Sequence, residues 1–568
     1  MFRKTRKEKQ LDLFYSPGNL LGKRALKKYD DPKAWQNIFY KEVTSRIDED
    51  IFSVLFNAHN GAPNASVCRL VAMMLLKEGY GCSDEQLFEM CEFDLLARRA
   101  LGIEGFEEDI PCAATYYNFR AAIMEYNATH ERDLLQECFE QVTGGQARDY
   151  GVSGRSVRMD SKIIGSNIAL YSRYELVHRT LLASLEGADL SALSPELRAL
   201  TEAYLGEDAA KTVYRTDSEG MKSRFLSLGE YVYALLRAKK GMPLLERVFK
   251  DQFTVEDGVV TVRPGKEIAA DSLQNPNDPD ATYRRKNSQR VQGYSTNITE
   301  TCGEEGKPSL ITGVQVETAT HADSDFLQEG VSQSERVTCG TVEKVHADGA
   351  YQSPGNREFA ASHLHDGDKG MELLTGKMQG EARFDLSLEG EELTVTDRRT
   401  GKTTKAEKAA SRPRKGGEPT RRWRIPWAKD KGQPWKYFSE KDVAASELRR
   451  LIESLPPDDQ KMRNNVEATM FQYSLHTHNN KTRYRGLAKH RMQALARCMW
   501  VNLRRLVIFN SLPVFHHSCA LLGFIWASVT SHKNYISKFA SKLWGAIWPT
   551  LERHILSDNV KYSTCAPF

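Results

Sequence analysis

The segment from Glu343 to Ser353 reads "EKVHADGAYQS", and its interpretation decides the fold of the second half of the chain. A short run with strand character ends there on Asp348, and a glycine follows directly. An aspartate before a glycine is most often a turn residue. It can also bind a metal ion at the tip of a strand, since Gly349 would let the backbone turn sharply away. Alone, the segment favours a turn. Whether Asp348 binds a metal ion depends on which other acidic residues the fold brings near it.

Length and composition indicate a multidomain globular protein. The chain has 568 residues, a net charge of +4, 40% hydrophobic and 27% charged residues, which are ordinary values for this class. Its ten cysteines include no CxxC pair, so we expect reduced thiols and neither a zinc site nor disulfides. No apolar segment follows the basic N-terminus, and the most apolar run, 519–529, is too short to span a bilayer. We therefore expect no signal peptide and no membrane segment.

Residues 40–145 have the pattern of an all-helical domain, with apolar residues at helical spacing. Ser83 and Gln86 fit a capping box at the start of one helix. A third long helix is predicted over 111–142, with Thr115 as its N-cap.

The remaining boundaries follow from changes in pattern. Residues 1–39 are basic and polar, which predicts an extended arm. From 150 to 510, strand patterns alternate with helical ones, which indicates an α/β core built on one mixed sheet. Two insertions interrupt this core, a helical one over about 171–253 and a β-rich, basic one over about 370–440. A helical tail is predicted from 511 to 568.

Three acidic residues stand out by context. Asp160 lies in "RMDSK", near the end of a predicted strand, as Asp348 does in "HADGAY". Glu467 lies in "RNNVEATMFQYS", which has a helical pattern. The three are far apart in the chain, so only the fold can bring them together.

The motifs around these acids resemble, in the same order, those of DDE-type transposases of bacterial insertion sequences. The resemblance covers about 40–510 outside the insertions. It is carried by "GAPNASVCRLVAMMLLKEGYGCSDEQLFEMCEFDLLARRALGI", "RMDSK", "NDPDATYRRKNSQRVQGYSTNI", "ETATHADSDFL", "HADGAYQS" and "RNNVEATMFQ" with the basic helix after it. The resemblance implies an RNase H-like catalytic core behind a helical domain that binds DNA or mediates dimerisation. It also implies an activity, the metal-dependent cleavage of the element's ends and their joining to target DNA.

In such a transposase, Asp160, Asp348 and Glu467 would be the catalytic residues and would bind two Mg²⁺ ions, with Mn²⁺ as a substitute. Carboxylates suit Mg²⁺, which prefers oxygen ligands, and a metal pair can hold the attacking and leaving oxygens of a displacement at phosphorus. The implied partners are double-stranded DNA, as terminal inverted repeats and as target, and a second copy of the chain in a homodimer on DNA. The implied location is the bacterial cytoplasm, at the nucleoid.

The resemblance extends to a Tyr-Arg-Glu-Lys signature around the third acid, in which the Tyr, Arg and Lys help to position DNA. Arg463 matches the arginine, four residues before the glutamate and on the same helical face. Gln460 and Ser474 stand where the tyrosine and the lysine are expected. Lys481 or Arg483 could take the place of that lysine.

Basic clusters are expected to contact DNA phosphates, which dominate the affinity of such proteins for DNA. Besides the N-terminal arm, the candidate DNA contacts are Arg284, Arg285, Lys286, Arg290, Arg421, Arg422, Trp423, Arg424, Arg463, Lys481, Arg483, Arg485 and Lys489. Trp423 is expected to stack on exposed bases. Asp323 and Asp325 in "HADSD" are expected to cap a helix and not to bind metal.

Two alternatives remain open on the sequence alone. An inactive, transposase-derived DNA-binding protein would keep the basic clusters, and the altered Tyr and Lys positions allow it. An RNase H-like nuclease would cleave DNA without joining it.

Overall fold

The computed structural model describes residues 1–5, 21–57, 60–105, 108–191, 193–286, 289–365, 369–375, 382–414, 417–427, 434–454, 456, 462 and 464–531, the last part of it as backbone alone from 512 on. The chain divides into two compact units, Met1–Arg505 and Leu506–Phe568. The fold is mixed α/β, as the sequence predicts. The predicted helical tail is helical up to Ser531, and its remaining residues lie outside the described part.

The N-terminal part is all-helical over its described residues. Its elements are α2 (Lys23–Tyr29), α3 (Trp35–Phe39), η1 (Tyr40–Thr44), η2 (Glu49–Leu55), α4 (Val67–Tyr80), α5 (Asp84–Phe93), α6 (Leu95–Ala100), α7 (Ala113–Thr129) and α8 (Leu134–Asp149). The extended arm predicted over 1–39 is wrong from Lys23 onward, because α2 and α3 are helical there. Residues 6–20 of that arm lie outside the described residues.

Local capping signals explain most of these boundaries. Ser83 and Gln86 form the predicted capping box of α5. The predicted third helix is in fact two helices, because the Asp133 carboxylate accepts from two backbone N–H groups and starts α8 anew. Thr115 is not an N-cap, since Cys112 occupies that position of α7.

One mixed sheet forms the centre of the core. Its strands are β1 (Ser156–Gly165), β4 (Thr282–Lys286), β5 (Gln289–Thr301), β6 (Ile311–Thr318), β7 (Lys344–Ala347) and β10 (Glu372–Thr375). The order is β10-β7-β1-β5-β4, and β6 also pairs with β5. β10, β7 and β1 are parallel to one another, whereas β5 is antiparallel to β1, β4 and β6.

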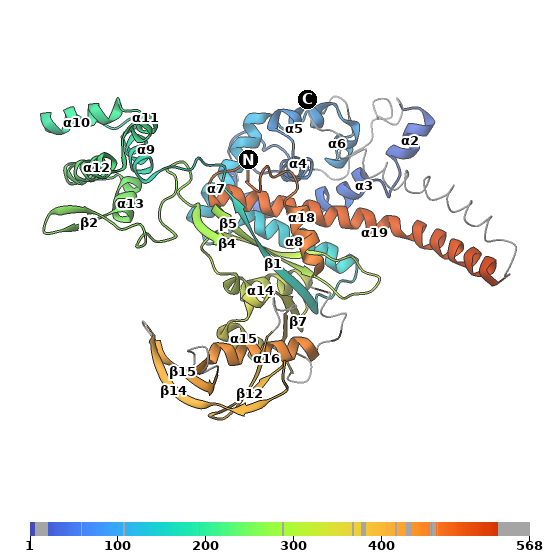
Figure 1. Cartoon of the computed structure of the whole chain (residues 1–568). Coiled ribbons are helices and arrows are strands. Elements are labelled where there is room, and N and C mark those ends of the chain that lie inside the picture. Colours follow the sequence, from blue (N-terminus) through green and yellow to red (C-terminus); the bar gives the residue numbers. More distant parts are fainter. Residues whose placement is uncertain are drawn as a thin grey trace. The chain divides into compact units, whose positions relative to one another are not determined.

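Helices cover the two faces of this sheet (Figure 1). One face packs Val157 and Met159 of β1 against Leu327 and Val331 of α14 (Leu327–Thr338), which follows η3 (Asp323–Phe326). The other face carries Arg158, Asp160 and Lys162, because side chains alternate along a strand. α18 (Asn464–Tyr473) and the long α19 (Leu487–Ser531) contact that second face. After β7 come η4 (Gly349–Tyr351), α15 (Pro354–Ser362) and the short pair β8 (Leu364–His365) and β9 (Lys369–Gly370).

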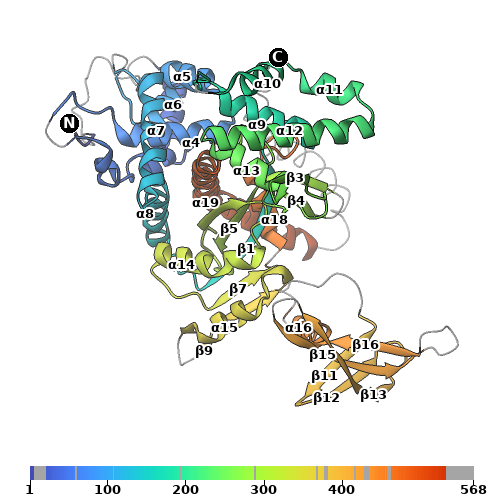
Figure 2. The ribbon, with the colours of Figure 1, turned by 90° about the vertical axis from the view of Figure 1, so that its left-hand side faces the viewer.

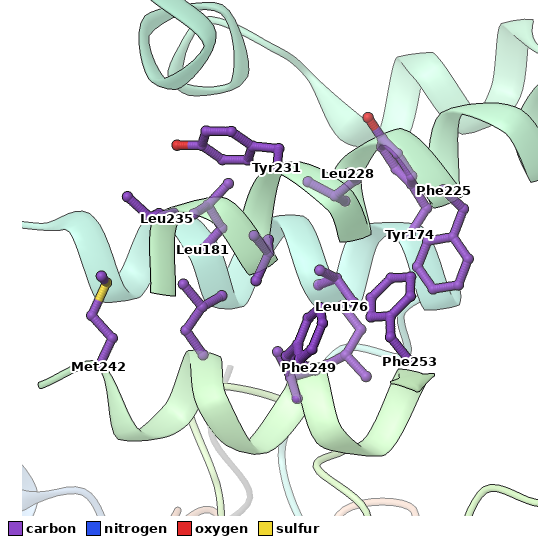
Figure 3. Close-up of a cluster of buried hydrophobic side chains, with 14 of the residues drawn as sticks. Tyr174, Leu176, Leu181, Phe225, Leu228, Tyr231, Leu235, Met242, Phe249 and Phe253 are labelled. Carbon is purple, nitrogen blue, oxygen red and sulfur yellow. The ribbon is translucent and has the colours of Figure 1, made fainter. Parts of the chain in front are cut away.

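The first insertion is helical, as predicted. It consists of α9 (Arg173–Leu185), α10 (Pro195–Leu205), α11 (Ala209–Arg215), α12 (Ser218–Ala238) and α13 (Pro243–Gln252), and the hairpin β2 (Phe253–Glu256) and β3 (Val259–Val262) follows. It has an apolar core of its own, in which side chains such as Leu176, Leu228 and Phe249 turn toward one another (Figure 3).

The second insertion is β-rich. It has two three-stranded sheets, which lie beside α16 (Glu440–Ser454) (Figure 2). The first sheet consists of β11 (Phe384–Glu389), β12 (Glu392–Asp397) and β13 (Thr403–Lys405), and the second of β14 (Glu407–Arg414), β15 (Gly417–Pro426) and β16 (Trp435–Ser439). Leu386, Leu393, Trp423 and Phe438 share its small apolar core. Within the described residues, no helix combines the length and apolarity needed to cross a membrane. The eight cysteines whose side chains are described form no disulfide.

Candidate active site

Asp160 lies on β1, and Asp348 directly follows β7, the parallel neighbour of β1. Ser156, Val157 and Arg158 of β1 pair with Lys344, Val345 and His346 of β7. Continued by two residues, this register places Asp160 beside Asp348, with about 5 Å between their Cα atoms at the usual strand spacing. Both aspartates project from the face opposite the apolar cluster that contains Met159 and Ala347.

Each of the two carboxylates accepts a hydrogen bond from the backbone N–H that follows it. Asp348 is exposed, and one of its oxygens accepts from the N–H of Gly349 at 2.5 Å. Asp160 is half-buried, and its Oδ1 accepts from the N–H of Ser161 at 2.9 Å. β7 ends at Ala347, directly before Asp348. The predicted position of Asp160 near a strand end is wrong, since β1 continues to Gly165 and only its pairing with β7 stops before this residue.

Glu467 is exposed on α18, the helix that packs against β1 on the face of the two aspartates. Contacts at both ends of α18 fix its course along the strand. Arg158 Nη1 donates to the carbonyl oxygen of Met462 at 3.3 Å, and Lys162 Nζ donates to Ser474 Oγ at 2.6 Å. Asp160 lies between these two strand residues, and Glu467 lies between these two helix residues. The helix therefore brings the third acid over the strand that holds the first.

The donor chemistry of this site fits a hard divalent cation. Asp160 and Asp348 offer carboxylate oxygens in register on one face, and Mg²⁺ needs only one or two carboxylates besides water and substrate phosphates. Among the described residues, however, no three His, Cys, Asp or Glu side chains lie close enough together to hold one metal ion. The extended register thus makes the two aspartates neighbours, and Glu467 lies on the helix that packs on β1.

Tyr351 lies beneath the aspartates, on the opposite face of the sheet. Its side chain is fully buried, and its hydroxyl donates to Asn297 Oδ1 at 2.7 Å. Burial raises the pKa of Tyr351 well above its usual value, and the negative charges of Asp160, Asp323 and Asp348 add to that rise. The tyrosine is three residues after Asp348 in the same motif. Its hydrogen-bond partner Asn297 lies on β5, and sequence patterns alone do not place that strand next to the motif.

A buried ion network holds α18 on the sheet. Glu300 of β5 is fully buried and lies opposite Arg158 in the strand register. Its carboxylate pairs with Arg158 Nε at 2.5 Å and with Arg505 Nη2 at 2.7 Å, and it accepts from the Thr469 hydroxyl of α18. Glu300 carries no local signal in the sequence, because only the fold surrounds it with two guanidinium groups.

The comparison with known proteins bears on the helices at the start of the chain. The family model described as "Transposase domain (DUF772)" matches residues 28–122, from the end of α2 into α7. The chain carries a transposase domain. The resemblance drawn from the sequence is thereby confirmed for this part. No curated protein and no solved structure matches the chain.

The transposase domain is tied to the segment between α18 and α19. Tyr484 donates its hydroxyl proton to Glu78 at 2.5 Å, and the guanidinium of Arg483 donates to the carbonyl oxygen of Cys82 at 2.7 Å. Buried Arg497 of α19 donates to the carbonyl oxygen of Glu78 and also to that of Tyr473 at the end of α18. Arg497 thus links the domain to the helix that bears the third acid.

Several predicted DNA contacts of the core are bound within the protein. Arg284 pairs with Asp323 at 3.1 Å and donates to the carbonyl oxygen of His321 at 2.9 Å. Asp323 and Asp325 do not cap a helix as predicted, since Ala322 is the N-cap residue of η3 and no side chain bonds there. Instead, Asp323 binds Arg284, and Asp325 accepts from the Ser324 hydroxyl at 3.0 Å.

The other basic residues of the core differ in their surroundings. Arg285 and Arg290 are exposed on β4 and β5, as are Lys481 and Lys489 in and after the segment that follows α18. Arg485 Nε donates to the carbonyl oxygen of Asn167 at 3.1 Å. Lys286 is described by its backbone alone, and Arg463 lies outside the described residues.

Strand β15 turns Arg422 and Arg424 to one face and buries Trp423 on the other. Trp423 is 2% exposed, and its indole N–H donates to the carbonyl oxygen of Glu391 at 3.2 Å. The prediction that Trp423 stacks on DNA bases is therefore wrong, because its ring belongs to the apolar core. Arg422 and Arg424 lie over the rings of Tyr437 and Trp435, at 4.5 and 4.1 Å from the ring centroids, and Arg421 pairs with Glu440.

Proposed function

We propose that the chain is a DDE-type transposase that cleaves DNA at the ends of an insertion sequence and joins them to target DNA. The observation that carries this proposal is that Asp160 lies on β1 and Asp348 directly follows its parallel neighbour β7, while α18, which bears Glu467, packs on β1. The transposase domain at residues 28–122 supports a reaction on DNA.

The sheet supports an RNase H-like core in this proposal. Three strands, β6, β5 and β1, are connected antiparallel, and β7 and β10 extend the sheet from β1 in parallel. The first acid lies on the central strand β1, and the second lies at the end of its parallel neighbour. Both lie on the face of the sheet that α18 contacts, where Asp348 is exposed and Asp160 is half-buried.

Asp160, Asp348 and Glu467 are the residues that would hold two Mg²⁺ or Mn²⁺ ions. Such a pair supplies Lewis-acid stabilisation of the attacking and leaving oxygens. The chain's part is to fix the two aspartates on a rigid sheet and to bring Glu467 from α18. Glu300 and Thr469 anchor that helix from below.

The proposed reaction has two displacements at phosphorus. In the first, the oxygen of water bonds to the phosphorus, the bond from phosphorus to the 3′ oxygen breaks, and the water proton passes to solvent. In the second, the freed 3′-hydroxyl attacks a target phosphorus, and the target's 3′ oxygen leaves. No covalent bond to the protein forms. Two ends must be joined together, so we propose that a homodimer acts on DNA, in the cytoplasm at the nucleoid.

The test is a cleavage and joining reaction with the full chain and duplexes from the DNA that flanks the gene. Asp348→Asn keeps the size of the side chain and removes its charge, so Mg²⁺-dependent cleavage should fall by at least about 100-fold. The matched control is Asp325→Asn, an exposed aspartate whose carboxylate bonds only to the Ser324 hydroxyl among the described residues. Unchanged cleavage in Asp348→Asn would refute the proposal.

A second candidate is an inactive, transposase-derived DNA-binding protein. It is favoured by the finding that no three potential ligands among the described residues form one metal-binding group. In that case the wild-type chain binds the same duplexes in EDTA but does not cut them with Mg²⁺. Cleavage without joined products would instead identify a nuclease.

A further inference from the structure

Lys162 is a half-buried cation on the strand that carries Asp160, and it has no ion-pair partner among the described residues. It lies on β1 two residues after Asp160, and side chains two apart share a face of a strand. Its ammonium donates to Ser474 Oγ at 2.6 Å, directly after α18. Ser474 is seven residues after Glu467, which is about two helical turns, so both point to the same side of the helix.

The described surroundings of this ammonium offer a hydroxyl as its partner. Among the described residues, no carboxylate forms an ion pair with Lys162, and the Ser474 hydroxyl is its hydrogen-bond partner. That hydroxyl in turn donates to the carbonyl oxygen of Met470 at 2.9 Å, so its oxygen is held ready to accept from the lysine. A half-buried charge without an ion-pair partner is costly, and a phosphate ligand would supply the opposite charge.

We propose that Lys162 binds a phosphate of a DNA strand that lies against β1 and the C-terminal end of α18, and holds it beside Asp160 and Asp348. The inference rests on the proposed function and deepens it. Three carboxylates repel a phosphodiester, and a fixed ammonium on the same face offsets that repulsion where the strand must lie. Lys162 is a DNA-binding residue next to the site, and neither Lys481 nor Arg483 is needed for this contact.

A purely structural role is the competing explanation. Ser474 follows the last residue of α18, and a cation near a helix C-terminus stabilises the helix through its dipole. The two roles differ in one measurable property. A phosphate contact contributes about 0.9 to the slope of log affinity against log salt concentration, and a helix contact contributes nothing to that slope.

The experiment measures binding of a fluorescein-labelled duplex of arbitrary sequence to the full chain in EDTA, across a NaCl series. Lys162→Met keeps the apolar stem and removes the charge. The double variant Lys162→Met with Ser474→Lys moves the ammonium across the same hydrogen bond onto the helix. The control is Lys211→Ala, an exposed lysine of the helical insertion that pairs with Asp208 at 3.1 Å.

We expect Lys162→Met to flatten the salt slope by about 0.9, the double variant to restore it, and the control to leave it unchanged. In the cleavage reaction, the single variant should lose about 10- to 100-fold and the double variant should regain most of it. A salt slope that Lys162→Met leaves unchanged, with or without a lower melting temperature, overturns the inference. The inference is also overturned if the double variant has the melting temperature of the wild type but does not restore the salt slope. If the wild type binds but never cleaves, the proposed function fails, and the slopes still decide the role of Lys162.

Discussion

Replacement of Glu300 by glutamine should release α18 from the sheet. The carboxylate is fully buried between Arg158 and Arg505, at 2.5 and 2.7 Å, and it also accepts from Thr469. Glutamine keeps the shape but removes the charge, and its amide group must place N–H donors against guanidinium donors. The two arginines are themselves largely buried, with 8% and 17% of their side chains exposed. After the loss of the carboxylate, the two guanidinium groups cannot be solvated by water unless their side chains move.

The size of the effect follows from this burial. Loss of one partner of a buried ion pair costs about 3–5 kcal/mol, because the remaining charge is left uncompensated. At about 1.4 kcal/mol per tenfold change, local opening of α18 should become more frequent by at least about two orders of magnitude. The matched control is Glu453→Gln. Glu453 pairs with Arg398 at 2.7 Å, but its side chain is 57% exposed, so its pair contributes at most about 1 kcal/mol.

The measurement is hydrogen–deuterium exchange of peptides that cover α18 and β5 in the full chain. Glu300→Gln should raise exchange in both elements, and Glu453→Gln should leave both unchanged. Cleavage should fall together with the loss of protection, because Glu467 lies on the released helix. If Glu300→Gln exchanges like the wild type in α18, the network does not hold the third acid, and the reasoning is wrong.

Three further predictions concern stability. Burial lowers the pKa of His490 to about 4, below the value of about 6.5 for an unfolded histidine, so the unfolded chain alone binds the proton in between. The contribution of neutral His490 to the free energy of unfolding is therefore fully present above pH 6.5, and about 3 kcal/mol of it is lost as the pH falls through 4. The urea midpoint of the wild type should fall over this pH range, and that of His490→Asn should change less. Trp423→Ala should cost about 3–5 kcal/mol in the β-rich insertion, seen as faster exchange in β12 and β15, because the ring is 2% exposed. The Asn502 side chain hydrogen-bonds the backbone N–H and the carbonyl oxygen of Ile311, at 2.7 and 2.9 Å. Asn502→Ala should lower the free energy of unfolding by about 1–3 kcal/mol for each of these backbone groups and should speed hydrogen exchange of the Ile311 amide.

Local signals in the sequence predicted the parts of the fold that local forces determine. The capping box of Ser83 and Gln86 forms as predicted, and a strand ends directly before Asp348. The helical pattern around Glu467 is confirmed. The single helix predicted over 111–142 is wrong, because the apolar spacing continues across the break that Asp133 caps.

Long-range pairing determines what the sequence could not predict. Asp160 lies within β1 and not near its end, since β5 extends the strand by antiparallel pairing well past that residue. Trp423 is buried in the core of the insertion. The sequence could not predict this, because the alternation of β15 does not say which of its two faces the rest of the insertion covers. The partner of Lys162 is more than 300 residues away in the chain, so no local pattern connects this residue with Ser474.

The most direct measurement is iron-directed cleavage of the protein backbone at the proposed metal site. Fe²⁺ bound in place of Mg²⁺ generates hydroxyl radicals with ascorbate and peroxide, and these cut the chain near the bound ion. We predict cuts in the full chain around Asp160 and around Asp348, suppressed by excess Mg²⁺ and lost in Asp348→Asn but not in Asp325→Asn. Cuts confined to other segments, or a pattern unchanged in Asp348→Asn, would show that the two aspartates do not share a metal site.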